Sequence, residues 1–232
     1  MTKVSAGSYD LNKWLFGGYD SDIITVIYGG AGTGKTNFCM VAAVSQAKKG
    51  RKVIYIDTEG GFSTERVKQL VGNGNGIDYE KVLENILILK PTNFVEQKEA
   101  FDELNKYLKD EVALIAVDGM TILYRLDFAS ARSDGEKEMQ KINSELVRQM
   151  KTLAEIARKR HIPVLVTNQI YRWNDEGKMV AGDILQYWGK CLIELVNDAG
   201  KRTAILNKHR SLPEKILNFQ IYDSGIRKRG WI

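Results

Sequence analysis

Short apolar runs alternate with amphipathic segments along most of the chain. The runs over Ile23–Tyr28, Lys52–Asp57 and Val112–Asp118 each have the length of one strand. Continuous apolar runs of this length are typical of parallel strands that are covered on both faces. From Asp134 to Arg160 the apolar residues recur at steps of three or four, which predicts the longest helix of the protein.

The remaining segments continue this alternation and then turn into a run of strands. Helices are expected over 38–47, 64–70 and 93–109, and strands over 86–89, 163–167, 191–196, 203–206 and 216–222. Such an order favours an α/β fold with a mostly parallel, twisted sheet, helices on both faces and an antiparallel C-terminal extension. We expect residues 1–22 to form a short lead-in and 23–232 to form a single core domain, with no separate module before it.

Composition limits the class of protein further. The 232 residues are enough for one well-packed α/β domain, and 44% of them are hydrophobic. The longest apolar runs are interrupted by charges and the N-terminus lacks the apolar core of a secretory signal, so we expect no membrane association. Cys39 and Cys191 lie in separate apolar segments, which favours reduced thiols and a cytoplasmic location over a disulfide or a metal pair.

The net charge of +5 is a feature of the C-terminal part of the chain. From Lys201 onward there are eight Lys or Arg and two acidic residues, whereas the first 200 residues are nearly neutral. Such a cluster can mark a face that binds a polyanion. Cations that only keep the protein soluble would produce the same pattern.

The stretch IITVIYGGAGTGKT carries the clearest chemistry. It fits the phosphate-binding pattern GxxxxGK[S/T] at every fixed position, directly after a predicted strand and before a predicted helix. Glycines expose backbone N–H groups to phosphate oxygens, Lys35 supplies a charge for the β and γ phosphates, and the Thr36 hydroxyl is a Mg²⁺ ligand. The predicted nucleotide-binding residues are Gly29, Gly30, Ala31, Gly32, Thr33, Gly34, Lys35, Thr36 and Asn37.

Hydrolysis of a bound nucleotide also needs a second Mg²⁺ group and a base for water. Asp118, which closes the strand VALIAVD, is placed to hold Mg²⁺ through water, although an ordinary strand-end carboxylate is the alternative. The next residue is Gly119, whereas many ATPases have their catalytic glutamate there, so the base must come from elsewhere. Glu59, just past the strand KVIYID, is the best candidate, and Gln169 follows a third strand at the same expected crevice. The alternatives are an exposed loop carboxylate and a plain strand-end turn.

Together these motifs resemble the RecA superfamily, and within it the archaeal and eukaryotic recombinase branch. The resemblance covers essentially the whole chain. The stretches that carry it are GGAGTGKT, YIDTEGGF over 55–62 with Glu65-Arg66 after it, AVDGMTILYR over 116–125, VTNQI over 166–170 and IYDSGI over 221–226.

The resemblance implies a RecA-type P-loop core that binds ATP and Mg²⁺. It implies that Glu59 is the catalytic glutamate, acting with Lys35, that Asp118 holds the metal, and that Gln169 links the nucleotide state to a DNA-binding loop. Arg66 would lie near the adenine. The family's two DNA-binding loops would fall at about 127–137 and 171–182. DNA contacts are expected from Tyr171, Arg172, Trp173 and Lys178, unless these side chains pack as a lid.

The resemblance is closest to core-only archaeal paralogues, because no helical DNA-binding domain or FxxA docking segment precedes the core. It implies a role in DNA repair and homologous recombination, with single-stranded or branched DNA as a ligand, weak Mg-dependent ATPase activity and little strand exchange. The recombinase RadA, a branched-DNA nuclease and further copies of this chain are the implied protein partners. A mediator or regulator of recombination is therefore the leading hypothesis.

Two other functions remain open at this point. A regulatory binding module could hold ATP as a structural ligand only. Lys208 and Arg210 resemble the cationic finger that clock-type and helicase-type ring ATPases insert into the neighbouring active site, which suggests a ring-forming motor. Alternatively, these two residues belong to the basic C-terminal face.

Overall fold

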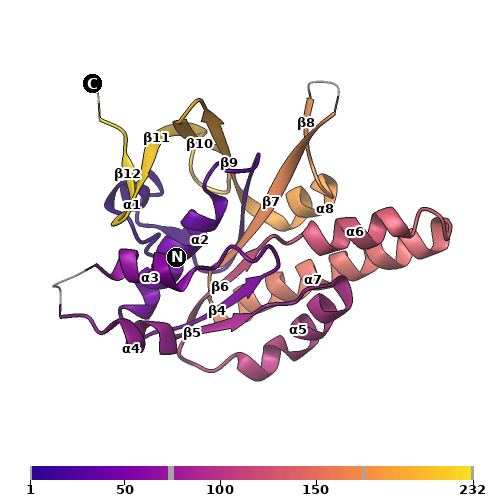
Figure 1. The fold of residues 1–232 in the computed structure, drawn as a ribbon, viewed down its shortest axis with the longest axis horizontal. Coiled ribbons are helices and arrows are strands. Elements are labelled where there is room, and N and C mark those ends of the chain that lie inside the picture. The colour runs from indigo at the N-terminus through magenta and orange to yellow at the C-terminus, as the bar shows by residue number, and fades with distance from the viewer. Residues whose placement is uncertain (1, 73–75, 174–175, 231–232) are drawn as a thin grey trace.

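The computed structural model describes residues 2–72, 76–173 and 176–230 and centres on a ten-stranded sheet with helices on both faces (Figure 1). The main path of the sheet has the strand order β12-β11-β10-β9-β3-β7-β6-β4-β5, and β8 pairs with β7 outside this path. All neighbours from β9 to β5 on this path are parallel, and β10 to β12 are antiparallel. The predicted fold class is confirmed.

The strands follow the apolar runs of the sequence closely. The parallel part contains β3 (Ile24–Gly29), β4 (Lys52–Asp57), β5 (Ile86–Leu89), β6 (Val112–Asp118), β7 (Val164–Trp173) and β9 (Gly189–Asp198). The antiparallel extension contains β10 (Lys201–His209), β11 (Lys215–Tyr222) and β12 (Gly225–Lys228), one strand more than the sequence predicts. Every residue of β3 is buried, as expected of a central strand covered on both faces.

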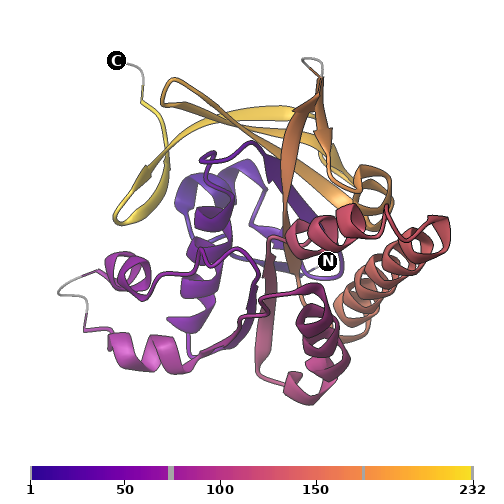
Figure 2. The same cartoon turned by 45° about the vertical axis from the view of Figure 1, so that its right-hand side comes forward.

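Two helical layers enclose the sheet. One face is covered by α1 (Tyr9–Trp14), α2 (Lys35–Ala47), α3 (Thr64–Val71) and α4 (Tyr79–Glu84), whose apolar residues form one core cluster. The other face is covered by α5 (Phe94–Tyr107), α6 (Ile122–Ser130), α7 (Glu136–Arg160) and α8 (Gly182–Trp188), which form a second cluster. Figure 2 shows the two layers on opposite sides of the central strands, with the C-terminal strands at the top.

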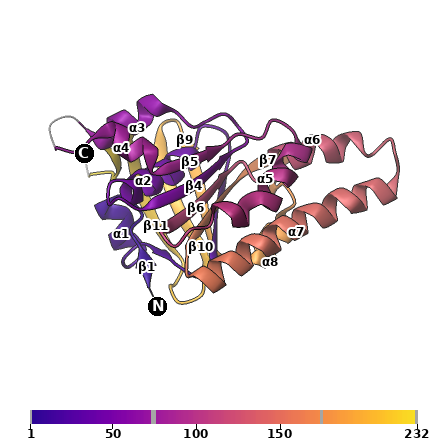
Figure 3. The ribbon, with the colours of Figure 1, turned by 90° about the horizontal axis from the view of Figure 1, so that it is seen from below.

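Local sequence signals explain where several helices begin and end. The Asn93 side chain accepts a hydrogen bond from the N–H of Glu96 at the start of α5, and Ser63 does the same for α3. The predicted helix over 134–160 is α7, a 25-residue helix that ends where His161 adopts a left-handed conformation. Figure 3 shows α6 and the first turns of α7 extending together beyond the sheet.

The two segments that the resemblance assigns to DNA-binding loops are more regular than expected. Most of the first, over 127–137, is helical, because it contains the end of α6 and the start of α7. The second, over 171–182, contains the hairpin of β7 with β8 (Glu176–Met179), which projects from the sheet in Figure 1. Aromatic and β-branched residues such as Ile170 and Tyr171 favour this continuation of the strand.

The N-terminal lead-in is also structured. Residues Lys3–Val4 (β1) and Tyr19–Asp20 (β2) pair as a small antiparallel sheet on either side of α1. Leu11 and Trp14 of α1 join the core cluster under α2, so this segment is an integral part of the core. Within the described residues, no helix is both long enough and apolar enough to cross a membrane.

Candidate nucleotide site

The phosphate-binding loop lies between the carboxyl end of β3 and the first turn of α2. Gly34 adopts a left-handed conformation with φ of 110°, which allows the chain to enter the helix directly at Lys35. No side chain caps the first turn of α2, so its N–H groups face the loop without a side-chain partner. The helix therefore presents free donors and the positive end of its dipole to this loop.

The Lys35 side chain is only 6% exposed and lies inside the loop. Its Nζ donates to the carbonyl oxygens of Gly29 and Gly30, at 3.1 and 2.8 Å. Burial lowers the pKa of Lys35, and the nearby carboxylates of Glu59 and Asp118 oppose this shift. The charge is thus held at the centre of the loop, where the pattern predicts contact with phosphates.

Asp118 is fully buried at the end of β6, and three hydroxyl groups surround its carboxylate. The Thr167 hydroxyl donates to Oδ1 at 2.7 Å, and the Tyr55 hydroxyl donates to Oδ2 at 3.0 Å. The Thr36 side chain from the first turn of α2 also hydrogen-bonds this carboxylate. Burial raises the pKa of Asp118, and the hydrogen bonds from these hydroxyls counteract that shift.

These residues fit a nucleotide with its Mg²⁺ ion. The uncapped N–H groups of α2 and the Lys35 ammonium suit phosphate oxygens. The Thr36 hydroxyl and Asp118 lie together beside them, and Mg²⁺ usually takes only one or two protein ligands, with waters and phosphates completing its shell. Within the described residues, no group of three or more His, Cys, Asp or Glu side chains could hold a metal ion.

A second strand-end aspartate shapes the turn that carries Glu59. Asp57 closes β4 directly opposite Asp118 in the parallel pairing of β4 with β6. Its carboxylate accepts hydrogen bonds from the N–H groups of Gly61 and Phe62, at 3.1 and 2.9 Å. These contacts hold the turn over 58–62 above the carboxyl ends of the two strands, where Glu59 lies.

Glu59 and Gln169 lie in direct contact, although 110 residues separate them in sequence. The Gln169 Nε2 donates to Glu59 Oε1 at 2.6 Å. Partial burial and the nearby Asp118 carboxylate raise the pKa of Glu59, while the hydrogen bond from Gln169 and the Lys35 charge lower it. The structure thus gathers Lys35, Asp118, Glu59 and Gln169, which the sequence places on four separate segments. They lie around the carboxyl ends of β3, β4 and β6 and the middle of β7, where Gln169 pairs with Gly29.

Known proteins resemble this chain in sequence and in fold. The family model described as Rad51 matches residues 1–229. The chain belongs to the Rad51 family. The DNA repair and recombination protein RadB of Methanobrevibacter smithii is 39% identical over 227 residues, which cover 93% of this chain and 92% of that protein. The protein of the same name from Methanocaldococcus jannaschii is 38% identical over 93% of this chain and 98% of its own length.

A solved structure agrees with these sequence matches. The crystal structure of the RadB recombinase superposes with a TM-score of 0.82 at 34% identity, covering 98% of this chain and all of that one. The resemblance that the motifs predict is therefore confirmed at the level of the family and the fold. The roles proposed for single residues rest on the contacts and burial of their side chains in this structure.

Gly119, the residue after Asp118, lies against the turn that carries Glu59 and has no space for a side chain. Its φ is +95°, and a Cβ built on it would lie 2.3 Å from Thr58 Oγ1 and 2.8 Å from Glu59 Cγ. The buried Thr58 hydroxyl donates to the carbonyl of Gly119 at 2.7 Å, so it is not free to move. The space that a side chain of residue 119 would need is therefore occupied by the turn that carries Glu59.

We therefore expect Gly119→Ala to lower the free energy of unfolding by about 3 kcal/mol, through steric overlap and backbone strain together. Gly50→Ala is a matched control, because Gly50 also has a positive φ, +74°, but nothing lies within 4 Å of the added Cβ. The control should cost about 1 kcal/mol, from the positive φ alone. Urea unfolding of both variants measures the difference, and equal losses would show that the contact with Thr58 and Glu59 does not matter.

Arg66, predicted near the adenine, lies at the rim of the loop. Its Nε donates to the Asn37 side chain at 2.9 Å, and its guanidinium donates to the carbonyls of Tyr222 and Asp223 at 2.9 and 3.2 Å. Asn37 is the residue after Thr36 on α2, so the structure brings together both outlying members of the predicted nucleotide set. The turn between β11 and β12 completes this edge of the site.

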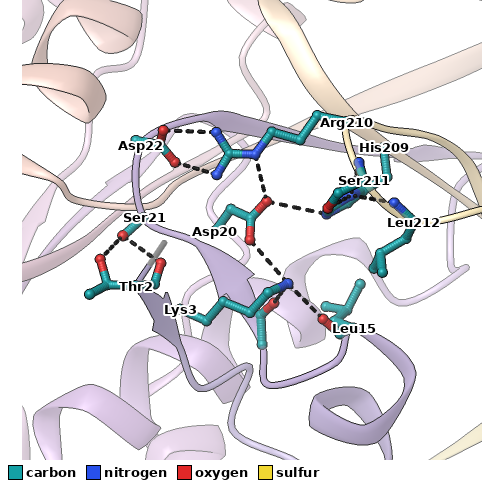
Figure 4. Close-up of polar contacts among 11 residues, drawn as sticks. Thr2, Lys3, Leu15, Asp20, Ser21, Asp22, His209, Arg210, Ser211 and Leu212 are labelled. Carbon is teal, nitrogen blue, oxygen red and sulfur yellow. Dashed lines mark hydrogen bonds and ion pairs between the residues drawn. The ribbon is translucent and has the colours of Figure 1, made fainter.

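Lys208 and Arg210 are engaged within the chain. The Lys208 ammonium donates to the carbonyls of Gln186 and Gly189, both at 2.9 Å. Arg210 forms a bidentate pair with Asp22, at 2.6 and 2.8 Å, and also donates to the buried Asp20 at 3.0 Å (Figure 4). These contacts support a structural role, and the finger that would act on a neighbouring subunit stays a prediction.

The strand register also places Arg210 away from the loop of its own chain. His209 pairs with Cys191, and Cys191 pairs with Thr25 near the start of β3. The phosphate loop begins at the opposite end of β3, after Gly29. The same cluster holds Lys3, whose ammonium lies 3.0 Å from Asp20, so these ion pairs join the lead-in to the C-terminal strands.

The residues predicted to contact DNA lie on the hairpin of β7 and β8. Tyr171 pairs with Lys178 across the hairpin, and both have described side chains. The side chains of Arg172 and Trp173 lie outside the described residues. The Tyr171 hydroxyl donates to Gln169 Oε1 at 3.0 Å, so this tyrosine contacts the nucleotide site as well as belonging to the hairpin.

Several residues of the site were missed by the sequence analysis. Tyr55 and Thr167 are spaced like ordinary core positions of strands, and only the order of the strands in the sheet brings them to Asp118. Asp57 could have been found from the sequence, because the apolar runs KVIYID and VALIAVD both end in aspartate. The sequence predicts DNA contact or packing in a lid for Tyr171, and its contact with Gln169 is not predicted because it requires the strand to continue into the hairpin.

Proposed function

We propose that this chain is a DNA repair and homologous-recombination protein that binds DNA and Mg-ATP and hydrolyses ATP slowly. We propose that it acts as a mediator or regulator and carries out little strand exchange. The observation that carries the proposal is the assembly of Lys35, Asp118, Glu59 and Gln169 at one end of the sheet, within a Rad51-family chain. The RadB relatives are DNA repair and recombination proteins by name, which supports the proposal.

Each residue has a distinct role in this proposal. Lys35 and the N–H groups of α2 bind the phosphates, and Thr36 and Asp118 hold Mg²⁺, which neutralises charge that develops on the phosphoryl group. Glu59 orients the attacking water and accepts its proton. Its raised pKa brings it closer to the range in which a carboxylate is an effective base near neutral pH.

Slow turnover is supported by the contacts of two arginines, Arg66 at the rim of the site and Arg210 away from it. Phosphoryl transfer is fastest when a second cation, beyond the loop lysine, reaches the transferring group. Arg66 is held by Asn37 and by carbonyls of the β11–β12 turn, and Arg210 is held by Asp20 and Asp22. Lys35 is therefore the cation proposed to contact the phosphates, and full activity would require a second cation from a partner.

A second candidate function is a regulatory module that keeps ATP as a structural ligand. One observation favours it. The hydrogen bond from Gln169 to the Glu59 carboxylate lowers the pKa of Glu59, and this makes the carboxylate a weaker base toward water. The two candidate functions predict different rates of ATP turnover but the same binding of ATP and DNA.

Measuring ATP turnover and DNA affinity on the same preparation, with and without single-stranded or branched DNA, separates these functions. We expect slow hydrolysis that DNA stimulates several-fold, because the hairpin that carries Tyr171 is connected to Gln169. Binding of ATP and DNA without any turnover would favour the structural-ligand module. The salt concentration must be fixed, since contacts with phosphates dominate such affinities.

The partners and the compartment follow from the same proposal. We propose that the recombinase RadA or a branched-DNA nuclease docks on this protein, and that copies of the chain associate on DNA. A cytoplasmic location is supported by Cys39 and Cys191, which are both buried free thiols. Sizing the protein with DNA and a non-hydrolysable ATP analogue tests self-association, and a persistent monomer would reject it.

A further inference from the structure

A continuous chain of contacts leads from Glu59 to α6. Gln169 Nε2 donates to Glu59 Oε1 at 2.6 Å, and the Tyr171 hydroxyl donates to Gln169 Oε1 at 3.0 Å. The guanidinium of Arg125, on α6, lies 3.5 Å from the centre of the Tyr171 ring. Tyr171 and Arg125 thus lie behind the amide, on the side away from the catalytic carboxylate.

The tyrosine hydroxyl favours one of two orientations of the amide. The two ends of a glutamine amide have nearly the same shape, but only the NH₂ end can donate to an ionised carboxylate. If the amide were flipped, Gln169 Oε1 would face Glu59 Oε1 at hydrogen-bond distance and the two oxygens would repel each other. A hydroxyl that donates to Oε1 from behind stabilises the observed orientation, because each polar atom of the amide then has a suitable partner.

Arg125 strengthens this arrangement in two ways. Its charge over the face of the ring draws electron density from the phenol, which makes the Tyr171 hydroxyl a better donor. It also ties β7 to α6, and α6 begins only four residues after Asp118. A second link runs nearby, because the Thr121 hydroxyl, just before α6, hydrogen-bonds the Asn168 side chain of β7. Both α6 and the β7–β8 hairpin are therefore linked to Glu59 through residues of β7.

We propose that Tyr171 and Arg125 are positioning residues, which orient the Gln169 amide and through it hold Glu59 ready for the attacking water. This inference rests on the proposed ATPase function. It adds to that function a control point, since a ligand that binds the β7–β8 hairpin or α6 would change the position of the tyrosine and, through Gln169, that of the glutamate. Neither residue touches the substrate.

The first test is the turnover of Tyr171→Phe, which keeps the ring and removes only the hydroxyl. We expect kcat to fall about tenfold with KM within about twofold, as for loss of one hydrogen bond that orients a catalytic group. Arg125→Gln should lower kcat about threefold, the smaller effect of a cation that acts through the ring. The double variant Tyr171→Phe/Gln169→Ala should be no slower than Gln169→Ala alone.

Matched controls come from a second cation–aromatic pair on the surface. Lys190 Nζ lies 5.5 Å from the centre of the Tyr187 ring, and Tyr187 is 70% exposed on α8. Tyr187→Phe and Lys190→Gln should leave kcat and KM unchanged. If Tyr171→Phe matches these controls, or if the double variant is clearly slower than Gln169→Ala, the proposed positioning role is wrong.

A second measurement does not depend on turnover. In the proton–nitrogen NMR spectrum, the Gln169 side-chain amide is identified as the signal lost in Gln169→Ala. One of its protons should lie well downfield, since it is held by a carboxylate at 2.6 Å, and Tyr171→Phe should move it toward the position of a free amide. If the wild-type protein showed no turnover, the proposed ATPase would fail. An unchanged amide signal in Tyr171→Phe would overturn the positioning role alone.

Discussion

Glu59→Gln is expected to lower the rate of Mg-ATP hydrolysis by about a hundredfold or more, the usual contribution of a positioned general base. The change keeps the size of the side chain and can keep a hydrogen bond to Gln169, but it removes the group that accepts the proton. ATP affinity should stay within about threefold, because the proposed phosphate contacts come from Lys35 and the first turn of α2 and not from Glu59. The variant therefore separates binding from chemistry.

Single-turnover hydrolysis and binding of a fluorescent ATP analogue measure the two quantities. Glu80→Gln, an exposed carboxylate in the first turn of α4, serves as a control and should match the wild type. A pH profile adds a second check. The base acts when ionised and burial raises its pKa, so the wild-type rate should fall with decreasing pH at a higher pH than for an ordinary glutamate. An unchanged rate in Glu59→Gln would assign the proton to another group.

Local sequence determines much of this site. The phosphate loop needs only a strand, a short glycine-rich segment and a helix in this order, so the motif GGAGTGKT predicts the strand before it and the helix after it. The absence of a carboxylate at position 119 predicts that the base comes from another segment, with Glu59 as the best candidate. The structure shows why Gly119 carries no side chain, because the turn that follows β4 fills the space beside it. Parallel strands bring their carboxyl ends to one edge, which is why residues from separate segments could be grouped in advance.

The contacts missed from the sequence all depend on strand order or register. Asp57 lies beside Asp118 because β4 pairs with β6, and Thr167 reaches Asp118 because β7 is the other neighbour of β6. A single sequence predicts strands but does not give their order in the sheet. The hairpin of β7 and β8 was missed for a related reason, since antiparallel pairing is a contact between two segments and neither shows it alone.

The ion pairs of Arg210 illustrate the same limit for charges. Lys208 and Arg210 looked like exposed cations, because nothing near them in sequence neutralises them. Asp20 and Asp22, which pair with Arg210, lie almost 190 residues earlier, and the fold brings them to it across the edge of the core. Lys208 donates to the carbonyls of Gln186 and Gly189. A charge count along the sequence therefore overstates how much of the C-terminal basicity is available for a polyanion.

Lys35→Ala should weaken the binding of Mg-ATP by about a hundredfold, which corresponds to about 3 kcal/mol for a buried charge that contacts phosphates. The nucleotide loses this ammonium, while the N–H groups of α2 remain to bind phosphate oxygens. In the free protein the Gly29 and Gly30 carbonyls also lose their donor, so some loss of stability is expected as well. The experiment must separate these two effects.

Lys48→Ala is a control with closely similar contacts. Lys48 lies at the other end of α2, and its ammonium also donates to two backbone carbonyls, those of Leu70 and Val71 at 3.3 Å. It should lower stability to a similar extent and leave the affinity for ATP unchanged. Calorimetric titration with an ATP analogue and thermal unfolding of both variants distinguish a lost phosphate contact from a weakened helix.

The same pair of variants tests whether ATP controls DNA binding. If the contacts from Glu59 through Gln169 to the hairpin transmit nucleotide state, ATP should change the DNA affinity of the wild type and of Lys48→Ala. Lys35→Ala should lose this dependence at ATP concentrations that saturate the wild type and should bind DNA as the nucleotide-free protein does. Equal DNA affinity of the wild type with and without ATP would show that nucleotide and DNA bind independently, and that the relay through Gln169 serves hydrolysis alone.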